Sequence, residues 1–454
     1  MVDELLFSGQ LIAVTMEETD DFRLQINNEA ISFLQQLVEP ILVVSFHGPK
    51  KSGKSALVHS LLQLEQESMT GGVWLYIKRA NYPNAKYLAV LDRPGFGTEK
   101  QVDRLLYSIL SGLSSVVVHH VNGQLTSDSV DHFSFLAGNA EGSDVPLAYD
   151  FPQSPRLLWV LQNVTTAKIK EKVQESGLSL QQIEQTYMCN ALAALTDDSP
   201  SARAIKLFEA IYSNSRCFPV PPKETEAFKS RVEKLLRVLT DPIHNIYHKN
   251  MVFNGPLAGF VLVTMLSCRD NVFATFKGQI WDNLIDNCCL RVVEDAVKLY
   301  KLRMSQKLSS IVNISDPKES KQLLTANQDY QAAVQKCQKS IEVTIMNVPC
   351  ESGVLYCKHS IAKREAKKNL RAIPVQSESR RTFFQKMFRN LVESEFATFQ
   401  EKNECMSSEL CHSLLATLHT KMTENVNAQS MVGPMDDENG YCVQSAEFKV
   451  ECLT

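Results

Sequence analysis

The 454-residue sequence lacks any hydrophobic run long enough to cross a lipid bilayer. Its longest apolar stretch, residues 259–266, is well short of the roughly 20 residues that a membrane-spanning helix needs. The chain also begins with acidic residues, Asp3 and Glu4, where a secretory signal peptide carries basic ones. We therefore expect no transmembrane segment and a cytoplasmic location.

No two cysteines follow the C-x-x-C spacing of zinc and redox sites, although the chain has 12 cysteines. They are scattered, and the Cys288-Cys289 doublet lies in a helical pattern. The sequence therefore favours buried reduced thiols over a disulfide or zinc framework. The net charge of −4 disfavours general binding to nucleic acid. With 44% hydrophobic and 22% charged residues, the composition is typical of a globular protein of two or three domains.

What the sequence does contain is a glycine-rich loop with the residues of a phosphate-binding site. Residues 48–55 read GPKKSGKS and fit the pattern G-x-x-x-x-G-K-[ST]. In this pattern Gly48 and Gly53 let backbone N–H groups turn inward onto phosphate oxygens. Lys54 reaches the β- and γ-phosphates, and the Ser55 hydroxyl contacts Mg²⁺.

The segments on either side of the loop support this prediction. Residues 41–46 form a short apolar run that predicts a buried strand. Residues 56–62 predict a helix whose N-terminal dipole faces the anion. The alternative is a chance match in an ordinary glycine-containing turn, which this context disfavours.

A second candidate element of the site follows the hydrophobic segment of residues 87–91. Asp92 ends this predicted strand, where an acid can hold Mg²⁺ through water. Gly95 follows three residues later, and this D-x-x-G spacing predicts that its N–H senses a γ-phosphate. The alternative is a plain strand and turn with Asp and Gly as turn formers.

Hydrophobic runs that predict strands alternate with helical patterns in the first half of the chain. The strand-like runs are residues 41–46, 73–77, 87–91, 115–119 and 157–161. One helix is predicted over residues 30–38, capped by Asn27 or Asn28 and ended by Pro40. This alternation predicts an α/β fold with a mostly parallel sheet and flanking helices.

From about residue 256 the patterns are helical almost to the end. Apolar residues recur at four-residue spacing at Ile280, Leu284, Cys288, Val292, Ala296 and Tyr300. Breaks are predicted at Pro317, Pro349 and Pro374. We predict a nucleotide-binding α/β domain over residues 1–270, an all-helical domain over 271–435 and a flexible tail over 436–454.

The segment between the two nucleotide motifs adds a family resemblance. Residues 70–74, which read TGGVW, resemble the switch region of guanylate-binding proteins, large GTPases related to atlastin and more distantly to dynamin. Residues 91–97 are similar to that family's L-D-T-E-G-L-G, and residues 252–256 to its V-N-G-P. Weaker similarities lie at residues 300–304 and at Phe399, Asn403, Cys411, Leu414 and Leu415. The resemblance extends from about residue 20 to 430.

The resemblance implies a P-loop GTPase fold and a protein that binds GTP with Mg²⁺ and hydrolyses it. Nucleotide would drive homodimerisation and movement of the helical part, and the family's link to innate defence is analogy only. Thr70 would join Ser55 and Asp92 as a ligand of Mg²⁺, and Ser68 would orient the attacking water. The implied nucleotide contacts are Gly48, Lys51, Ser52, Gly53, Lys54, Ser55, Ala56, Asp92, Gly95, Gln162 and Asn163. For Thr70 the alternative is a polar loop without a role.

Three positions depart from the family pattern. Lys51 stands where the family carries an arginine finger, and lysine keeps the charge but lacks the bidentate fork, so slow turnover is expected. The alternative is a solvated Lys51. Pro94 replaces an acid that helps to organise water. Asn163 replaces the aspartate that reads guanine, and an amide cannot pair with both guanine N–H groups. The alternative is that Gln162 and Asn163 only begin a polar loop.

These departures leave two further hypotheses open: a hydrolysis-deficient nucleotide-binding scaffold and a base-unselective NTPase.

A basic stretch over residues 358–389 contains interleaved aromatic residues. It predicts either a surface for anionic lipid or a protein partner, or a helix with one face in the core and a solvated basic face. The second interpretation is favoured.

Overall fold

The structure is a computed structural model that describes most of the chain. The described residues are 4–16, 22–65, 71–82, 85–93, 95, 100–131, 155–173, 177–194, 205, 208, 212, 215–241, 252–267, 278–305, 350, 352–375 and 377–430. The chain divides into two compact units. Unit 1 comprises Met1–Cys289 and Ala372–Arg381, and unit 2 comprises Leu290–Arg371 and Thr382–Thr454. The predicted boundaries near residues 270 and 435 stay predictions.

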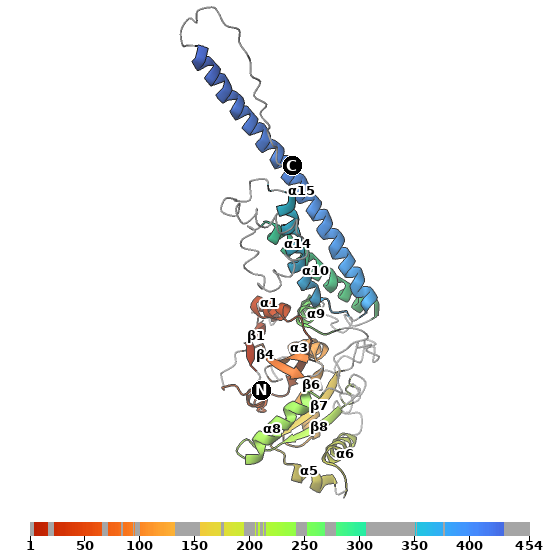
Figure 1. The fold of residues 1–454 in the computed structure, drawn as a ribbon. Helices are drawn as coiled ribbons and strands as arrows, with labels where there is room; N and C mark the ends of the chain where they lie inside the picture. The colour runs from red at the N-terminus through yellow and green to blue at the C-terminus, as the bar shows by residue number, and fades with distance from the viewer. Residues whose placement is uncertain are drawn as a thin grey trace, which may run out of the picture. The chain divides into compact units, whose positions relative to one another are not determined.

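Unit 1 contains one eight-stranded sheet in the order β2-β1-β4-β5-β3-β6-β7-β8 (Figure 1). The strands are β1 Leu5–Met16, β2 Phe22–Ile26, β3 Ile41–His47, β4 Val73–Tyr82, β5 Ala85–Asp92, β6 Val116–Asn122, β7 Arg156–Gln162 and β8 Ser215–Val220. The pairs from β5 through β3, β6 and β7 to β8 are parallel, and the pairs among β2, β1, β4 and β5 are antiparallel. The mostly parallel sheet confirms the predicted fold class, and all five predicted strands are present.

Helices precede, connect and follow these strands. They are α1 Asn28–Gln36, α2 Lys54–Leu62, α3 Lys100–Leu113, α4 Ser127–Asp131, α5 Thr166–Val173, α6 Leu180–Ala193, α8 Glu226–Leu239, α9 Gly255–Ser267, α10 Gly278–Ser305, α14 Ser352–Lys368, η4 Asn369–Ala372 and α15 Glu378–Ser430. Asn27 caps α1 as predicted, because its side chain accepts a hydrogen bond from the Glu29 N–H at 2.9 Å, but the helix begins at Asn28, two residues before the predicted start. It ends at Gln36, two residues before the predicted end.

Both faces of the parallel part of the sheet are covered by helices. On β7, Leu157, Trp159 and Leu161 face a core cluster that includes residues of α3, α5 and α6. Leu158 and Val160 face the opposite cluster, with α2 and α8. Figure 1 shows α6 and α8 on opposite sides of β7 and β8. Every residue of β3 and β7 is buried, as expected for strands enclosed on both faces.

The segment before α9 is held by side-chain and backbone contacts within unit 1. Asn254 Nδ2 donates to the Ala372 carbonyl at 2.8 Å, and its Oδ1 accepts from the Leu257 N–H at 3.1 Å. A Cβ at Gly255 would lie 1.8 Å from the Leu34 carbonyl oxygen. Only glycine therefore permits this approach of α9 to α1, which gives the Asn254-Gly255 pair a structural role.

In α10 the predicted apolar stripe is largely confirmed. Its members Leu284, Cys288, Val292, Ala296 and Tyr300 are buried, whereas Ile280 is 51% exposed. In unit 2, Tyr300 Oη and His359 Nδ1 lie 2.9 Å apart in a hydrogen bond between α10 and α14.

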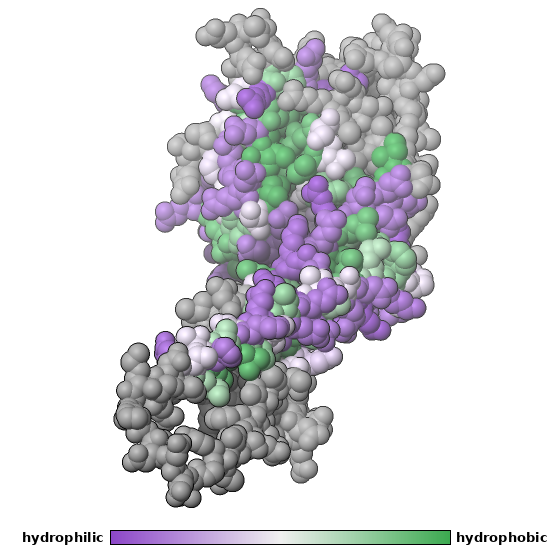
Figure 2. Space-filling view, turned by 90° about the horizontal axis from the view of Figure 1, so that it is seen from above, coloured by the Kyte–Doolittle hydropathy of each residue, from purple (hydrophilic) through white to green (hydrophobic). Residues whose placement is uncertain are grey.

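The basic stretch 358–389 mixes buried and exposed side chains. Phe384 and Phe388 are buried, while Phe383 is 56% exposed. The Lys363 ammonium forms an ion pair with Glu393. Figure 2, which colours one face of the molecule by hydropathy, shows hydrophilic and hydrophobic areas next to one another. The buried aromatic residues are those expected of a core-facing helix, and a partner for this stretch stays a prediction.

Two further properties concern membrane-spanning helices and the cysteines. No helix of the described residues is long and apolar enough to cross a membrane. The eight cysteines within the described ranges all carry free thiols. Burial raises the pKa of the Cys289 thiol to about 12, with the neighbouring Cys288 adding to the shift.

Candidate phosphate-binding site

The glycine-rich loop joins the end of β3 to the start of α2, as the sequence predicts. Gly53 has a left-handed conformation with φ of 91° and precedes Lys54, the first residue of α2. The N-cap residue Gly53 has no side chain to cap this end of α2, so the first N–H groups of the helix are oriented for an anion. A Cβ at Gly48 would lie 2.5 Å from the His120 carbonyl oxygen. The loop therefore lies directly against β6.

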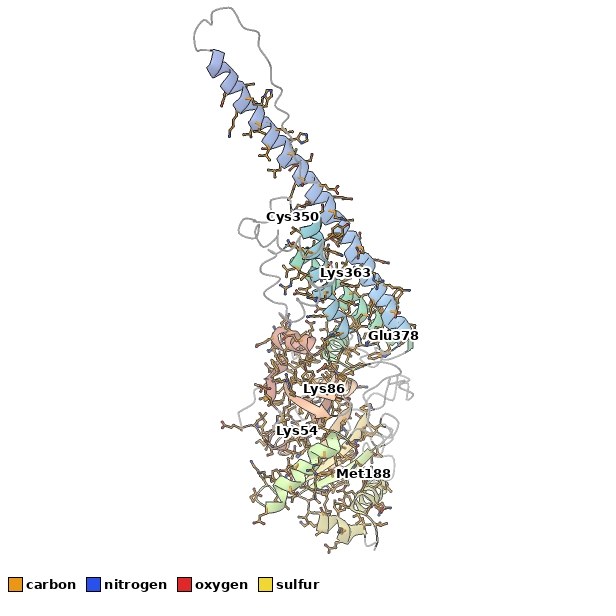
Figure 3. All side chains as sticks on the ribbon, viewed as in Figure 1. Lys54, Lys86, Met188, Cys350, Lys363 and Glu378 are labelled. Carbon is orange, nitrogen blue, oxygen red and sulfur yellow. The ribbon has the colours of Figure 1, made fainter. Side chains whose placement is uncertain are left out.

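Lys54, labelled in Figure 3, is buried within unit 1. It is 4% exposed, and its Nζ lies 3.1 Å from Oδ1 of the fully buried Asp92. Lys54 Nζ also donates to the Arg93 carbonyl oxygen. Asp92 ends β5, and Lys54 follows the loop that leaves the neighbouring parallel strand β3, whose Phe46 pairs with Asp92. The topology thus brings the loop lysine and the strand-end acid together, as the two motifs require.

Gly95 packs on the same loop. A Cβ at this position would lie 2.2 Å from the Lys50 nitrogen and 2.4 Å from the Pro49 carbonyl carbon. Neither neighbour can move without moving the loop backbone, so only glycine fits. The D-x-x-G segment and the glycine-rich loop are therefore in direct contact, and the prediction of one shared site agrees with this geometry.

Sequence reasoning missed an ion pair immediately after Asp92. Arg93 is 2% exposed, and its guanidinium donates to the Asp103 carbonyl oxygen at 3.0 Å and to the Asp103 carboxylate. Asp103 belongs to the first turn of α3. Burial lowers the pKa of Arg93, and the Asp103 charge opposes that shift.

Two further residues of β6 that sequence reasoning missed lie at the site. His120 Nδ1 lies 3.1 Å from the Ser52 hydroxyl. Burial lowers the His120 pKa to about 4, and the Lys54 charge adds to the shift. The second residue is Asn122 at the end of β6, which accepts a hydrogen bond from Asn163 Nδ2 at 2.8 Å.

The other predicted site residues that the structure describes range from buried to exposed. Lys51 is exposed, with φ of 58°, and Ser55 is half-buried in the first turn of α2 beside Ala56. Gln162 is buried and donates to the Pro221 carbonyl oxygen at 3.4 Å, and Asn163 is exposed in a left-handed conformation. Ser68, Thr70 and Pro94 lie outside the described residues, so the structure does not place them.

The described part of the site fits Mg²⁺ as a partner of bound phosphates. Both Asp92 carboxylate oxygens are buried, and neither accepts a well-aligned hydrogen bond from the described residues. Such a carboxylate suits a nearby cation in addition to Lys54. No group of three or more His, Cys, Asp or Glu side chains suited to a metal occurs among the residues that can be described. Mg²⁺ ordinarily uses one or two protein ligands together with phosphates, which Ser55 and Asp92 can supply.

Because unit 1 buries histidines whose pKa values are lowered, we expect it to lose stability in mild acid. His120 is neutral in the folded protein but binds a proton below about pH 6.5 when unfolded. Its contribution is therefore complete above this pH and is lost as the pH falls from 6.5 toward 4. Between pH 7.5 and 5.5 the expected loss from His120 is about 1.3 kcal/mol. The pKa values of His47 and His119 are also lowered, mainly by burial, and add in the same direction.

Denaturant titrations of the wild type, His120→Asn and His412→Asn at the two pH values measure this effect. We expect His120→Asn to have the smaller pH dependence. The exposed His412 is the control, and its replacement should leave the pH dependence unchanged. A wild-type unfolding free energy that is equal at both pH values would contradict the prediction.

Comparison with known proteins gives distant but consistent relatives. Guanylate-binding protein 1 of Chlorocebus aethiops is 24% identical over 148 residues, which are 30% of this chain and 25% of the relative. Guanylate-binding protein 6 of Pongo abelii is 20% identical over 260 residues, 51% of this chain and 40% of the relative. Guanylate-binding protein 3 of Homo sapiens is 20% identical over 478 residues, 98% of this chain and 73% of the relative. No protein-family model matches the chain.

The first two matches cover less than half of each relative. The chain spans 25% of the length of the first relative and 40% of the second. The match to the third extends over nearly the whole chain, including both units. The chain is thus similar, at 20 to 24% identity, to these guanylate-binding proteins, and the matches support a divergent member of that family.

Proposed function

We propose that this chain binds GTP with Mg²⁺ at the glycine-rich loop and hydrolyses it slowly. The observation that carries the proposal is the buried Lys54, which lies 3.1 Å from Asp92 at the uncapped start of α2. A buried ammonium group is costly unless anions surround it. Phosphates supply such anions, and the names of the relatives point to a guanine nucleotide.

Each described residue has a defined part in this proposal. Lys54 Nζ turns from Asp92 to the β- and γ-phosphate oxygens, while the first N–H groups of α2 hold the phosphates. The Asp92 carboxylate and the Ser55 hydroxyl are then available to Mg²⁺, which neutralises charge on the phosphates when bound. The Gly95 N–H contacts the γ-phosphate, and Ser52, Gly53 and Ala56 complete the loop.

The hydrolytic step depends on residues that are exposed or not described. Lys51 is exposed at the loop, and we propose that it supplies positive charge to the transition state without the fork of an arginine. Ser68 would orient water and Thr70 would bind Mg²⁺. We also propose, from the family, nucleotide-dependent homodimerisation with movement of the helical unit in the cytoplasm.

Replacement of Lys54 tests the binding site. We expect Lys54→Ala to abolish binding of a fluorescent GTP analogue, because the cation facing the phosphates is lost. The change also leaves the Asp92 carboxylate without its counter-ion, so folding is checked by circular dichroism. Lys86→Ala removes an exposed lysine of β5 (labelled in Figure 3) and should leave binding unchanged. Equal binding by wild type and a folded Lys54→Ala would exclude the proposed phosphate site.

Single-turnover hydrolysis with the same wild-type preparation separates a slow GTPase from a scaffold. Release of inorganic phosphate from bound GTP supports the GTPase. Stable binding without phosphate release supports a scaffold whose output is dimerisation, the alternative that Lys51, Pro94 and Asn163 favour.

A base-unselective NTPase is a second candidate, and the Asn163–Asn122 contact favours it. One N–H of Asn163 is used by Asn122, which leaves Asn163 to offer one donor and one acceptor. Guanine presents two N–H donors at the edge that an aspartate reads, so an amide satisfies one and opposes the other. The Asn163 position therefore contributes little discrimination between purines.

Replacement of Asn163 by aspartate tests this specificity. We expect Asn163→Asp to raise the affinity ratio of GTP over ATP by about tenfold, because a charged acceptor strengthens the hydrogen bonds by roughly 1.5 kcal/mol or more. The exposed Asn190 of α6 gives a control, Asn190→Asp, with the same change in net charge. An unchanged ratio measured by competition would show that Asn163 does not contact the base.

A further inference from the structure

Arg93 has contacts at both of its ends. Its carbonyl oxygen accepts a hydrogen bond from Lys54 Nζ. Its guanidinium donates to the carboxylate and, at 3.0 Å, to the carbonyl oxygen of Asp103. One residue therefore links the glycine-rich loop to the first turn of α3. It does so within the D-x-x-G segment, between the metal-binding candidate Asp92 and Gly95.

Burial makes the attachment to α3 strong. Arg93 and Asp103 are 2% and 4% exposed, so water does not replace either partner when the contact breaks. Removing one member of such a pair leaves an unpaired charge in the interior, which is much more costly than losing a surface ion pair. The two donors of Arg93 also restrict its orientation, which a single-point ammonium contact would not do.

The position of the pair gives it a consequence for phosphate sensing. Asp92 and Gly95 must keep their places above the loop while Lys54 exchanges the Arg93 carbonyl for a phosphate oxygen. When that hydrogen bond is lost, the pair with Asp103 remains as an anchor of the segment. Gly95 has little freedom, since a Cβ there would lie 2.2 Å from Lys50. The Gly95 N–H is the group that we expect to contact a γ-phosphate, so even a small shift of this N–H would change that contact.

We propose that Arg93 and Asp103 are positioning residues that hold the D-x-x-G segment in the geometry that distinguishes GTP from GDP. This inference rests on the proposed nucleotide site. Neither side chain is assigned a contact with nucleotide. Their effect reaches the Asp92 carboxylate and the Gly95 N–H, which lie on either side of Arg93 in the chain.

The test compares affinities for GTP and GDP in the full chain with Mg²⁺. The main variant is the double substitution Arg93→Gln with Asp103→Asn, which removes both charges together and leaves neither unpaired. We expect the affinity ratio of GTP over GDP to fall by about tenfold, in the range typical of coupling between a site and a structural element. Arg93→Lys, which keeps the charge but not the fork, should give an intermediate ratio. In single-turnover reactions the double variant should release phosphate more slowly.

A control for general destabilisation is present in another buried ion cluster of unit 1. Glu184 of α6 is 2% exposed, accepts a hydrogen bond from the Arg231 guanidinium of α8 and lies 3.6 Å from the Arg216 guanidinium, so it is the shared acid of a buried ion cluster. Glu184→Gln should lower the melting temperature without changing the GTP over GDP ratio. This control separates general destabilisation from a loss of positioning.

Three outcomes overturn the inference or the function beneath it. A double variant whose ratio lies within about twofold of the wild type would overturn the positioning role while leaving nucleotide binding established. A similar fall in the ratio for Glu184→Gln would show that the effect is general destabilisation. Absence of nucleotide binding by the folded wild type would overturn the proposed function itself.

Discussion

The buried ammonium group of Lys54 is the constraint on which the nucleotide site depends. A cation that is 4% exposed needs anionic or carbonyl partners, and Asp92 and the Arg93 carbonyl supply them. These partners reach Lys54 because β3 and β5 are parallel neighbours, so the chain leaves both strands at the same edge of the sheet. Gly95 packs directly against the loop backbone at Pro49 and Lys50. The glycine-rich loop and the D-x-x-G segment are therefore in contact.

Much of the fold could be predicted because parallel strands enclosed by helices are hydrophobic throughout. The residues of β3 and β7 are all buried, and their apolar runs are visible in the sequence. Three strands escaped prediction, β1, β2 and β8, and β1 and β2 belong to the antiparallel part of the sheet. β2 alternates half-buried and exposed residues in an antiparallel pair, and β8 contains Pro219 at the edge of the sheet. Proline is tolerated at an edge but argues against a strand when read in sequence.

The candidate site could be predicted only where its chemistry dictates spacing along the chain. The glycine-rich loop and the D-x-x-G segment have this property, since phosphate and Mg²⁺ require certain residue types in a fixed order. Arg93 and Asp103 show no such pattern, because a residue after a strand and an acid in a helical turn are both ordinary. The contact of Asn122 with Asn163 joins residues 41 positions apart and exists only through the pairing of β6 with β7. Tertiary contacts of this kind determine how the D-x-x-G segment is held and which groups Asn163 can offer to a base. The sequence motifs alone do not specify either.

The Mg²⁺ dependence of GTP affinity in wild type and Asp92→Asn tests the central claim most directly. The claim is that the partner of buried Lys54 becomes the partner of Mg²⁺ when phosphates are bound. Calorimetric titration with a non-hydrolysable GTP analogue, with Mg²⁺ and with a chelator, measures it. The account predicts that Mg²⁺ strengthens binding by the wild type and has much less effect on Asp92→Asn. An equal effect of Mg²⁺ on both proteins, or none on the wild type, would contradict it.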